Sequence, residues 1–129
     1  MKVRDLPPRP LLVVDPITSL AEVASLMRQD DSDSVAVMTE GRLLGIITER
    51  DLVGVIADGI DPRKAKADAL MSAHPTTVGA DEEVSMVAVK MVALGIRHMP
   101  VVDDLGLPIG LLSSRDLVGV LERGVAGPD

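Results

Sequence analysis

The chain has 129 residues, of which 47% are hydrophobic and 26% are charged, a balance that is typical of a globular domain and excludes a disordered chain. Its formal net charge of −7 disfavours binding to a phosphate backbone, and the absence of Phe, Tyr and Trp excludes the aromatic platforms on which single-stranded nucleic acids stack. The lack of cysteine excludes disulfides, iron–sulfur clusters and thiolate zinc sites.

Features of a membrane or export segment are missing from the sequence. No apolar run reaches the roughly 20 residues that a membrane-spanning helix needs, and residues 1–5 lack the apolar stretch of a signal peptide. We therefore expect a cytoplasmic location, with neither a nucleic acid nor a membrane as partner.

The first predicted elements are a short strand and an amphipathic helix. Residues 11–14 form an apolar run with β-branched residues between prolines, which is typical of a strand. Ser19 and Glu22 have the spacing of a capping box, and the helix that follows carries apolar residues on one face. The residues of this face are Leu20, Val23, Ala24 and Met27.

A hairpin and a second helix follow. The apolar runs 35–38 and 43–47 flank a turn that contains glycine, which predicts two paired strands. The second helix is predicted over residues 49–58, with Gly59 as its stop. Its inward residues are predicted to be Leu52, Val53 and Ile56.

The chain then repeats itself. Residues 45–55 return as residues 110–120, with glycine, a hydroxyl residue, Arg-Asp and Leu-Val-Gly-Val at matching positions. Residues 6–10 align with residues 71–75 at the same spacing, so that the repeat covers nearly the whole chain. We predict two repeats with the order strand, helix, strand, strand, helix, over residues 1–60 and 67–129, packed together as one compact module. Residues 61–66 are predicted to link them, with a further helical turn.

The second repeat has the corresponding elements. Its first strand is predicted over residues 76–78, and its first helix begins near Val84 and stops at Gly95. The hairpin turn around residues 103–106 carries one extra residue relative to the first repeat, at a position where length changes are tolerated.

Each copy of the repeated motif places a hydroxyl and a carboxylate at the start of a helix: Thr48 and Asp51 in the first, Ser113 and Asp116 in the second. A helix N-terminus favours a phosphate, and a carboxylate can accept both hydroxyl hydrogens of a ribose diol. The same spacing also fits a helix cap, in which the carboxylate reciprocates the hydroxyl. Spacing alone leaves both interpretations open.

The two motif copies, with residues 95–103 and Met71-Ser72 ahead of the second copy, resemble a tandem pair of cystathionine-β-synthase (CBS) domains, also called a Bateman module. The resemblance implies an α/β fold in which two β-α-β-β-α repeats pack with pseudo-twofold symmetry. It implies a regulatory module that binds an adenosine-containing ligand, namely AMP, ADP, ATP or S-adenosylmethionine, in the cleft between the repeats. It further implies a homodimer and signalling through self-association or an unidentified protein partner.

The resemblance also implies roles for individual residues. The motif aspartates contact the ribose, the apolar stretch at Met99 lines the base, and Arg97 with His98 faces the phosphates. The ligand-binding residues predicted in this way are Thr48, Asp51, Ser72, Thr76, Thr77, Arg97, His98, Met99, Pro100, Ser113, Arg115 and Asp116. The first repeat departs from this pattern, with Asp33-Ser34 where the second has Arg97-His98, so we expect one dominant nucleotide per chain.

No catalytic residue is predicted, because the chain offers no general base with an activated partner beyond His98. Two histidines without acidic partners at ligand spacing predict no metal site, and no covalent cofactor is expected. The alternative function is a ligand-free protein-interaction scaffold in which the Thr, Ser and Asp residues only cap helices. The apolar helix faces expected to form the homodimer comprise Val53, Val55, Ile56, Val118, Val120 and Leu121.

Overall fold

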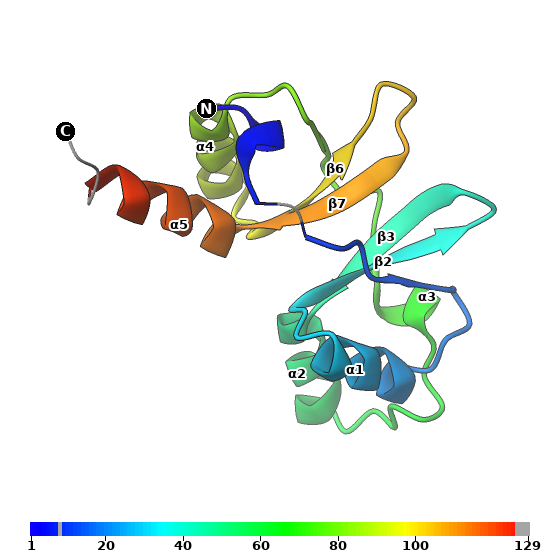
Figure 1. The fold of residues 1–129 in the computed structure, drawn as a ribbon. Coiled ribbons are helices and arrows are strands. Elements are labelled where there is room, and N and C mark those ends of the chain that lie inside the picture. The colour runs from blue at the N-terminus through cyan, green and yellow to red at the C-terminus, as the bar shows by residue number, and fades with distance from the viewer. Residues whose placement is uncertain (8, 126–129) are drawn as a thin grey trace. The chain divides into compact units, whose positions relative to one another are not determined.

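The computed structural model describes the backbone of residues 1–7 and 9–125, and the side chains of residues 1–7 and 9–120. The chain forms two compact units (Figure 1). Unit 1 combines Met1–Arg9 with Thr76–Asp129, and unit 2 is Pro10–Pro75. The compact units therefore have different boundaries from the sequence repeats. Residues 1–9 precede the first strand of the first repeat but belong to unit 1, which is built mainly from the second repeat. Residues 67–75 precede the first strand of the second repeat but belong to unit 2.

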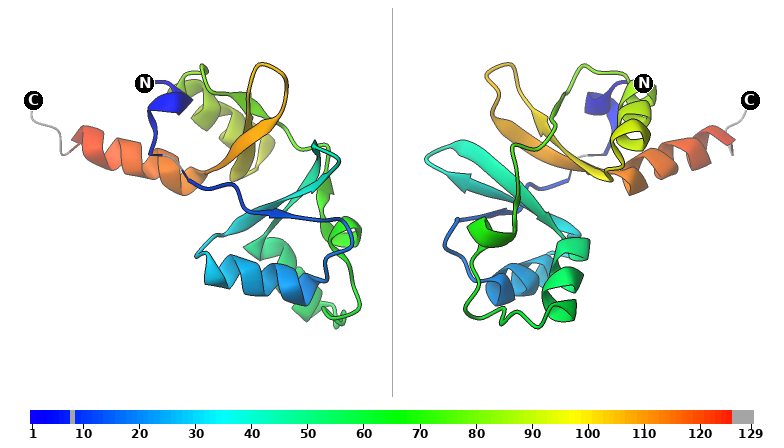
Figure 2. Two further views of the ribbon diagram at one scale, coloured as in Figure 1. Left: turned by 45° about the vertical axis from the view of Figure 1, so that its right-hand side comes forward. Right: turned by 180° about the vertical axis from the view of Figure 1, so that it is seen from behind.

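Unit 2 is a four-stranded sheet with helices. In chain order its elements are β1 (Val13–Val14), α1 (Leu20–Gln29), β2 (Ser34–Thr39), β3 (Arg42–Thr48), α2 (Glu49–Ala57), α3 (Ala67–Leu70) and β4 (Ser72–Ala73). The strand order is β1-β2-β3-β4, with β1 parallel to β2 and the other pairs antiparallel. Helices α1 and α2 lie side by side against this sheet (Figure 2), and its core includes Leu20, Val23, Val35 and Ile47.

Unit 1 has a three-stranded sheet among the residues that the structure describes. Its elements are the 3-10 helix η1 (Val3–Asp5), β5 (Val78–Gly79), α4 (Val84–Leu94), β6 (His98–Val102), β7 (Pro108–Ser113) and α5 (Ser114–Val125). The strand order is β5-β6-β7, with β5 parallel and β7 antiparallel to β6. The core joins residues of both helices and the sheet to Val3 and Leu6 of the N-terminal segment.

Backbone hydrogen bonds fix the N-terminal segment to the loop before α4. The N–H groups of Val3 and Arg4 donate to the carbonyls of Glu82 and Ala80, each at 2.9 Å. The Arg4 guanidinium also pairs with Asp81. Because Val3 is buried in the core between these anchors, the chain reaches Leu6 on a defined path along unit 1.

The same loop is held by Glu82. Its carboxylate accepts hydrogen bonds from Lys90 Nζ at 2.6 Å and from the Gly79 N–H at 2.7 Å. The Lys90 contact, with the Gly79 contact second, lowers the pKa of Glu82 below its ordinary value of 4.5. The contribution of this carboxylate to stability is therefore present at neutral pH and is lost as the pH falls from 4.5 through the lower, folded-state pKa.

Several predicted elements are confirmed. The first hairpin forms as β2 and β3, and its turn residues Glu40 and Gly41 have positive φ values of 50° and 75°, as a tight hairpin turn requires. Ser19 caps α1 by accepting from the Glu22 N–H at 3.2 Å. Helix α4 ends at Gly95, which has a φ of 66°.

Other sequence predictions were wrong in detail. On α2, Val53 and Ile56 are 65% and 78% exposed, whereas Val55 is 2% exposed and lies in the core. The inward stripe therefore runs through Leu52 and Val55, three residues apart, and not through Val53 and Ile56. Similarly, Ala24 of α1 is exposed, and the core residues of that helix are Leu20, Val23 and Met27.

The predicted first strands are shorter than expected. Strand β1 covers only Val13–Val14 and β5 only Val78–Gly79, because the parallel pairing with the neighbouring strand spans two residues in each unit. The helical turn expected within 61–66 lies instead at Ala67–Leu70.

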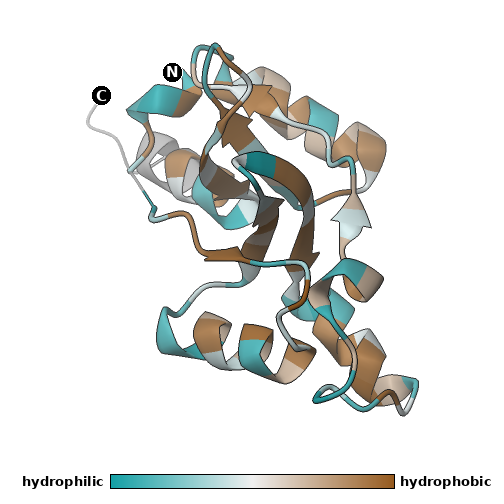
Figure 3. Cartoon of the chain, turned by 90° about the vertical axis from the view of Figure 1, so that its right-hand side faces the viewer, coloured by the Kyte–Doolittle hydropathy of each residue, from teal (hydrophilic) through white to brown (hydrophobic). Residues whose placement is uncertain are grey.

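The hydropathy of the residues follows this arrangement of elements: in Figure 3 the strands are largely brown (hydrophobic), and the helices alternate between brown and teal (hydrophilic). Over the described residues, none of the helices combines the length and apolar character that crossing a membrane requires.

Candidate functional site

The first motif copy forms a reciprocal helix cap. Thr48 is the N-cap of α2, and its Oγ1 accepts from the Asp51 N–H at 3.4 Å. In return, Asp51 Oδ2 accepts from the Thr48 N–H at 2.8 Å and from Thr48 Oγ1 at 3.1 Å. The capping interpretation of the motif is confirmed here, and it holds the carboxylate in a fixed orientation at the helix start.

The second copy repeats this arrangement at the start of α5. Asp116 Oδ2 accepts from the Ser113 N–H at 2.8 Å and from Ser113 Oγ at 3.4 Å. Its other oxygen, Oδ1, forms an ion pair with Arg9, whose Nε lies 2.8 Å away. The Asp116 side chain is only 10% exposed. Its carboxylate is therefore largely buried, and each of its two oxygens has a different partner residue.

Asp116 lines a pocket within unit 1 that has a volume of about 290 Å³. This is close to the lower end of the range for small-molecule sites, roughly 300–1,000 Å³. Its walls are mainly aliphatic, and among the described residues its polar side chains are two guanidinium groups and one carboxylate. Among the lining residues are Leu6, Pro7, Val101, Ile109, Gly110 and Leu111, together with Arg4, Arg9 and Asp116.

In unit 2, the chain itself lies against the glycine that corresponds to Gly110. Gly45 of β3 pairs with Ala73 of β4, and a Cβ atom on Gly45 would lie 2.6 Å from the Ser72 carbonyl oxygen and 2.9 Å from Met71 Cγ. Gly110 is the counterpart of Gly45 in the second repeat. A Cβ atom there would meet no described atom within 4 Å.

The reason for this difference can be read in the sequence. Ser72 and Ala73, which pair with β3, align with Pro7 and Pro8. Proline has no backbone N–H, so a Pro-Pro pair is unsuited to adding a further strand to a sheet. This difference in the sequence is a signal for the pocket, whereas Leu6 and Arg9 lie outside the repeated motif and were not among the predicted ligand-binding residues.

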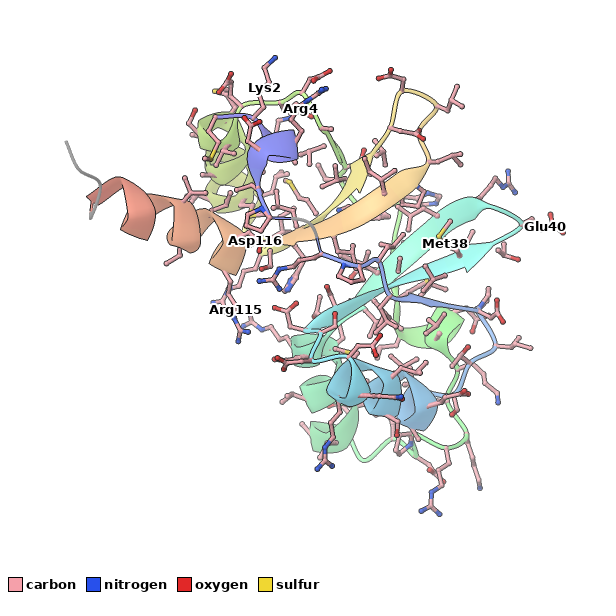
Figure 4. The ribbon with its side chains drawn as sticks, viewed as in Figure 1. Lys2, Arg4, Met38, Glu40, Arg115 and Asp116 are labelled. Carbon is pink, nitrogen blue, oxygen red and sulfur yellow. The ribbon has the colours of Figure 1, made fainter. Side chains whose placement is uncertain are left out.

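The structure gathers part of the predicted ligand-binding set around the start of α5. His98 pairs with Ser113 across β6 and β7, and the Arg97 carbonyl accepts from the Ser114 N–H at 2.9 Å. Asp116 and Arg115 both lie where α5 begins (Figure 4), but Arg115 is exposed. Of the predicted residues, Asp116 lines the pocket described above.

The remaining predicted residues are placed differently. Met99 and Pro100 are almost completely buried in β6, and Val101 of the same stretch lines the pocket. Thr76 and Thr77 are exposed and precede β5, and Arg97 is also exposed. Ser72 is exposed in β4 of unit 2, as part of the strand that fills the space beside Gly45. Their roles in ligand binding stay predictions.

Metal ligation has no support among the described residues, where no group of three or more His, Asp or Glu side chains is placed to hold an ion. The chemistry that the unit 1 pocket offers is therefore that of a fixed carboxylate, guanidinium groups and aliphatic walls. Such a set has the chemistry needed to bind a hydroxylated, partly apolar molecule.

The chain belongs to the CBS domain family, whose family model matches residues 3–58 and 67–123. It is similar to the CBS domain protein PAE2072 from Pyrobaculum aerophilum, solved in complex with AMP, with a TM-score of 0.84 and 26% identity over 97% of this chain and 99% of that one. It is also similar to the CBS domain pair of protein MJ0100, solved with 5′-methylthioadenosine and S-adenosyl-L-methionine, with a TM-score of 0.87 and 27% identity over 96% and 98% of the two chains.

Among curated sequences, the uncharacterized protein MK0525 of Methanopyrus kandleri is 36% identical over 122 residues. The chain spans 62% of the length of that relative, and 22% and 21% of the length of two enzymes that it also matches. The two matched repeats and the α/β fold show that the chain is a tandem CBS pair. Pairs of this kind are generally regulatory modules.

Proposed function

We propose that this protein is a regulatory, non-catalytic module that senses an adenosine-containing ligand in the pocket of unit 1. The observation that carries the proposal is the Asp116 carboxylate, fixed by Ser113 at the start of α5 and directed into a pocket with aliphatic walls. Two similar CBS pairs were solved with AMP or with 5′-methylthioadenosine and S-adenosyl-L-methionine, which supports an adenosine ligand here.

The residues of the pocket suit the two halves of such a ligand. A ribose diol donates two hydrogen bonds, and a carboxylate has about four acceptor positions, of which the Ser113 and Arg9 contacts leave room for more. The adenine lies between aliphatic side chains such as Leu6 and Leu111, because the chain has no aromatic ring on which the base could stack.

Ligand binding to the folded state is expected to raise thermal stability. At a free ligand concentration of 100 times Kd, the added stability is about 2.7 kcal/mol, which raises the melting temperature by several degrees. The measurement is a thermal-shift series with AMP, ADP, ATP and S-adenosylmethionine. An unchanged melting temperature with every one of them at millimolar concentration would contradict the sensor function.

The alternative function, a ligand-free interaction scaffold, has one observation in its favour. In both copies the hydroxyl and the carboxylate of the motif already serve a helix cap, which explains their presence without a ligand. The open pocket beside Asp116 favours the sensor, since a scaffold would have no need of it. The thermal-shift series separates the two, because the scaffold gains no stability from adenosine ligands.

We further propose that the protein acts as a homodimer in the cytoplasm and signals through self-association or an unidentified protein partner. Apolar side chains are exposed on its helices, with Val53 and Ile56 on α2 at 65% and 78%, and Val118 on α5 at 58%. Val55 is buried and Val120 packs against the core, so neither contributes to such a surface, and the Leu121 side chain lies outside the described residues.

Light scattering is expected to give a mass of about twice 13.6 kDa at micromolar concentration, because exposed apolar side chains favour association. The double variant Ile56→Glu and Val118→Glu is expected to shift the mass towards the monomer, since it places charges on these faces. Leu105→Glu, at an exposed apolar residue of a hairpin turn, is the matched control. A wild-type mass of 13.6 kDa would contradict the homodimer.

A further inference from the structure

Arg9 is the cation that contacts the Asp116 carboxylate. Its Nε lies 2.8 Å from Asp116 Oδ1, and the two side chains are 46% and 10% exposed, so the arginine is the more exposed partner of a largely buried carboxylate. Both residues line the unit 1 pocket. Arg4, the other guanidinium of the pocket, is paired with Asp81.

The guanidinium of Arg9 can serve two anions at once. It is planar and carries five N–H donors, of which the Nε edge faces Asp116. The Nη groups offer a fork that matches two oxygens of a phosphate. A phosphate in the pocket would therefore be bound without breaking the contact between Arg9 and Asp116.

Adenosine gains nothing from this group, because it places the same ribose against Asp116 as AMP does but offers the guanidinium no anion. S-adenosylmethionine carries a sulfonium cation next to the ribose, which repels a guanidinium at short range, and its carboxylate lies farther from the ribose at the end of the amino-acid arm. The electrostatics of the pocket thus distinguish adenosine ligands by the charge beside the ribose.

We propose that Arg9 determines specificity by selecting phosphorylated adenosine ligands over adenosine and S-adenosylmethionine. This inference rests on the proposed function and assigns the pocket to the nucleotide class. It gives Arg9 the role that the family resemblance gave to Arg97 and His98, neither of which is among the residues that line this pocket.

The test is isothermal titration calorimetry of the full chain with AMP, adenosine and S-adenosylmethionine. In Arg9→Gln we expect AMP to bind at least tenfold more weakly, about 1.4 kcal/mol, whereas adenosine binds as well as before or better. Arg9→Lys, which keeps the charge but loses the fork, is expected to fall between the two. Arg28→Gln removes the same charge from an exposed residue of α1 and is the matched control.

The outcomes separate the inference from the proposed function. Equal weakening of AMP and adenosine in Arg9→Gln, or unchanged AMP affinity, would overturn the specificity role while the sensor function stands. A greater loss of AMP affinity in Arg97→Gln than in Arg9→Gln would also overturn it. If the wild-type chain binds none of the three ligands, the sensor function and the inference both fall. If Arg9→Gln has a lower melting temperature than the wild-type chain, the test is made with Arg9→Lys. An AMP-to-adenosine affinity ratio in Arg9→Lys that equals the wild-type ratio would overturn the inference.

Discussion

Replacement of Asp116 by Asn is expected to weaken binding of an adenosine ligand by roughly 10- to 150-fold, the range that corresponds to hydrogen bonds with a charged group, about 1.5–3 kcal/mol. Asn keeps one acceptor oxygen but loses the charge that attracts Arg9 and the second oxygen that a ribose diol needs. The measurement is calorimetry with AMP.

The matched variant is Asp51→Asn, which makes the same chemical change in the other motif copy. Both aspartates accept a hydrogen bond from the backbone N–H of a capping residue at 2.8 Å, so both variants are expected to lose about 0.3–1 kcal/mol at the helix start, and Asp116→Asn loses its ion pair with Arg9 in addition. The AMP affinity of Asp51→Asn is expected to change by less than about twofold, because β4 fills the space beside Gly45. Equal losses of affinity in the two variants would show that both copies bind ligand.

Much of the fold could be predicted from the sequence, because the repeat transfers most assignments from one half to the other. Helix α4 and the β2–β3 hairpin follow from apolar periodicity and from glycines at positive φ, which are local signals. The inward face of α2 was assigned wrongly. Its apolar residues surround the helix, and only tertiary packing selects Val55 for the core and leaves Val53 and Ile56 exposed.

The candidate site was also predicted only in part. The motif aspartates were found because their chemistry repeats, and an asymmetry between the copies was predicted from Asp33-Ser34 in the first against Arg97-His98 in the second. Their sequences differ in the segment ahead of each repeat's first strand, where Ser72-Ala73 pairs with β3 and the aligned Pro7-Pro8 lacks the N–H groups for such pairing. Because Arg9 and Asp116 are more than 100 residues apart in the sequence, no local pattern links them.

Introducing a side chain at Gly110 is expected to abolish ligand binding and leave the fold intact. A Cβ atom at Gly110 meets no described atom within 4 Å, and Gly110 lines the pocket, so the leucine of Gly110→Leu would occupy the space that the ligand needs. We expect at least 100-fold weaker AMP binding, about 2.7 kcal/mol. Stability is expected to be unchanged or higher, since the leucine packs against aliphatic walls.

Gly45, the equivalent glycine of unit 2, provides the contrast. A side chain at Gly45 is expected to lower the stability of the fold, whereas one at Gly110 is expected to lower the ligand affinity. In Gly45→Ala the new methyl group would lie 2.6 Å from the Ser72 carbonyl oxygen, and a backbone atom cannot move aside without disturbing the β3–β4 pairing. Urea unfolding is expected to show a loss of about 1–3 kcal/mol, the range for overpacked sites. Gly110→Ala should change stability by less than about 1 kcal/mol, as for an unstrained glycine in a strand.

If Gly110→Leu binds AMP with wild-type affinity, the ligand does not occupy the pocket beside Asp116, and the site must be sought elsewhere in the chain.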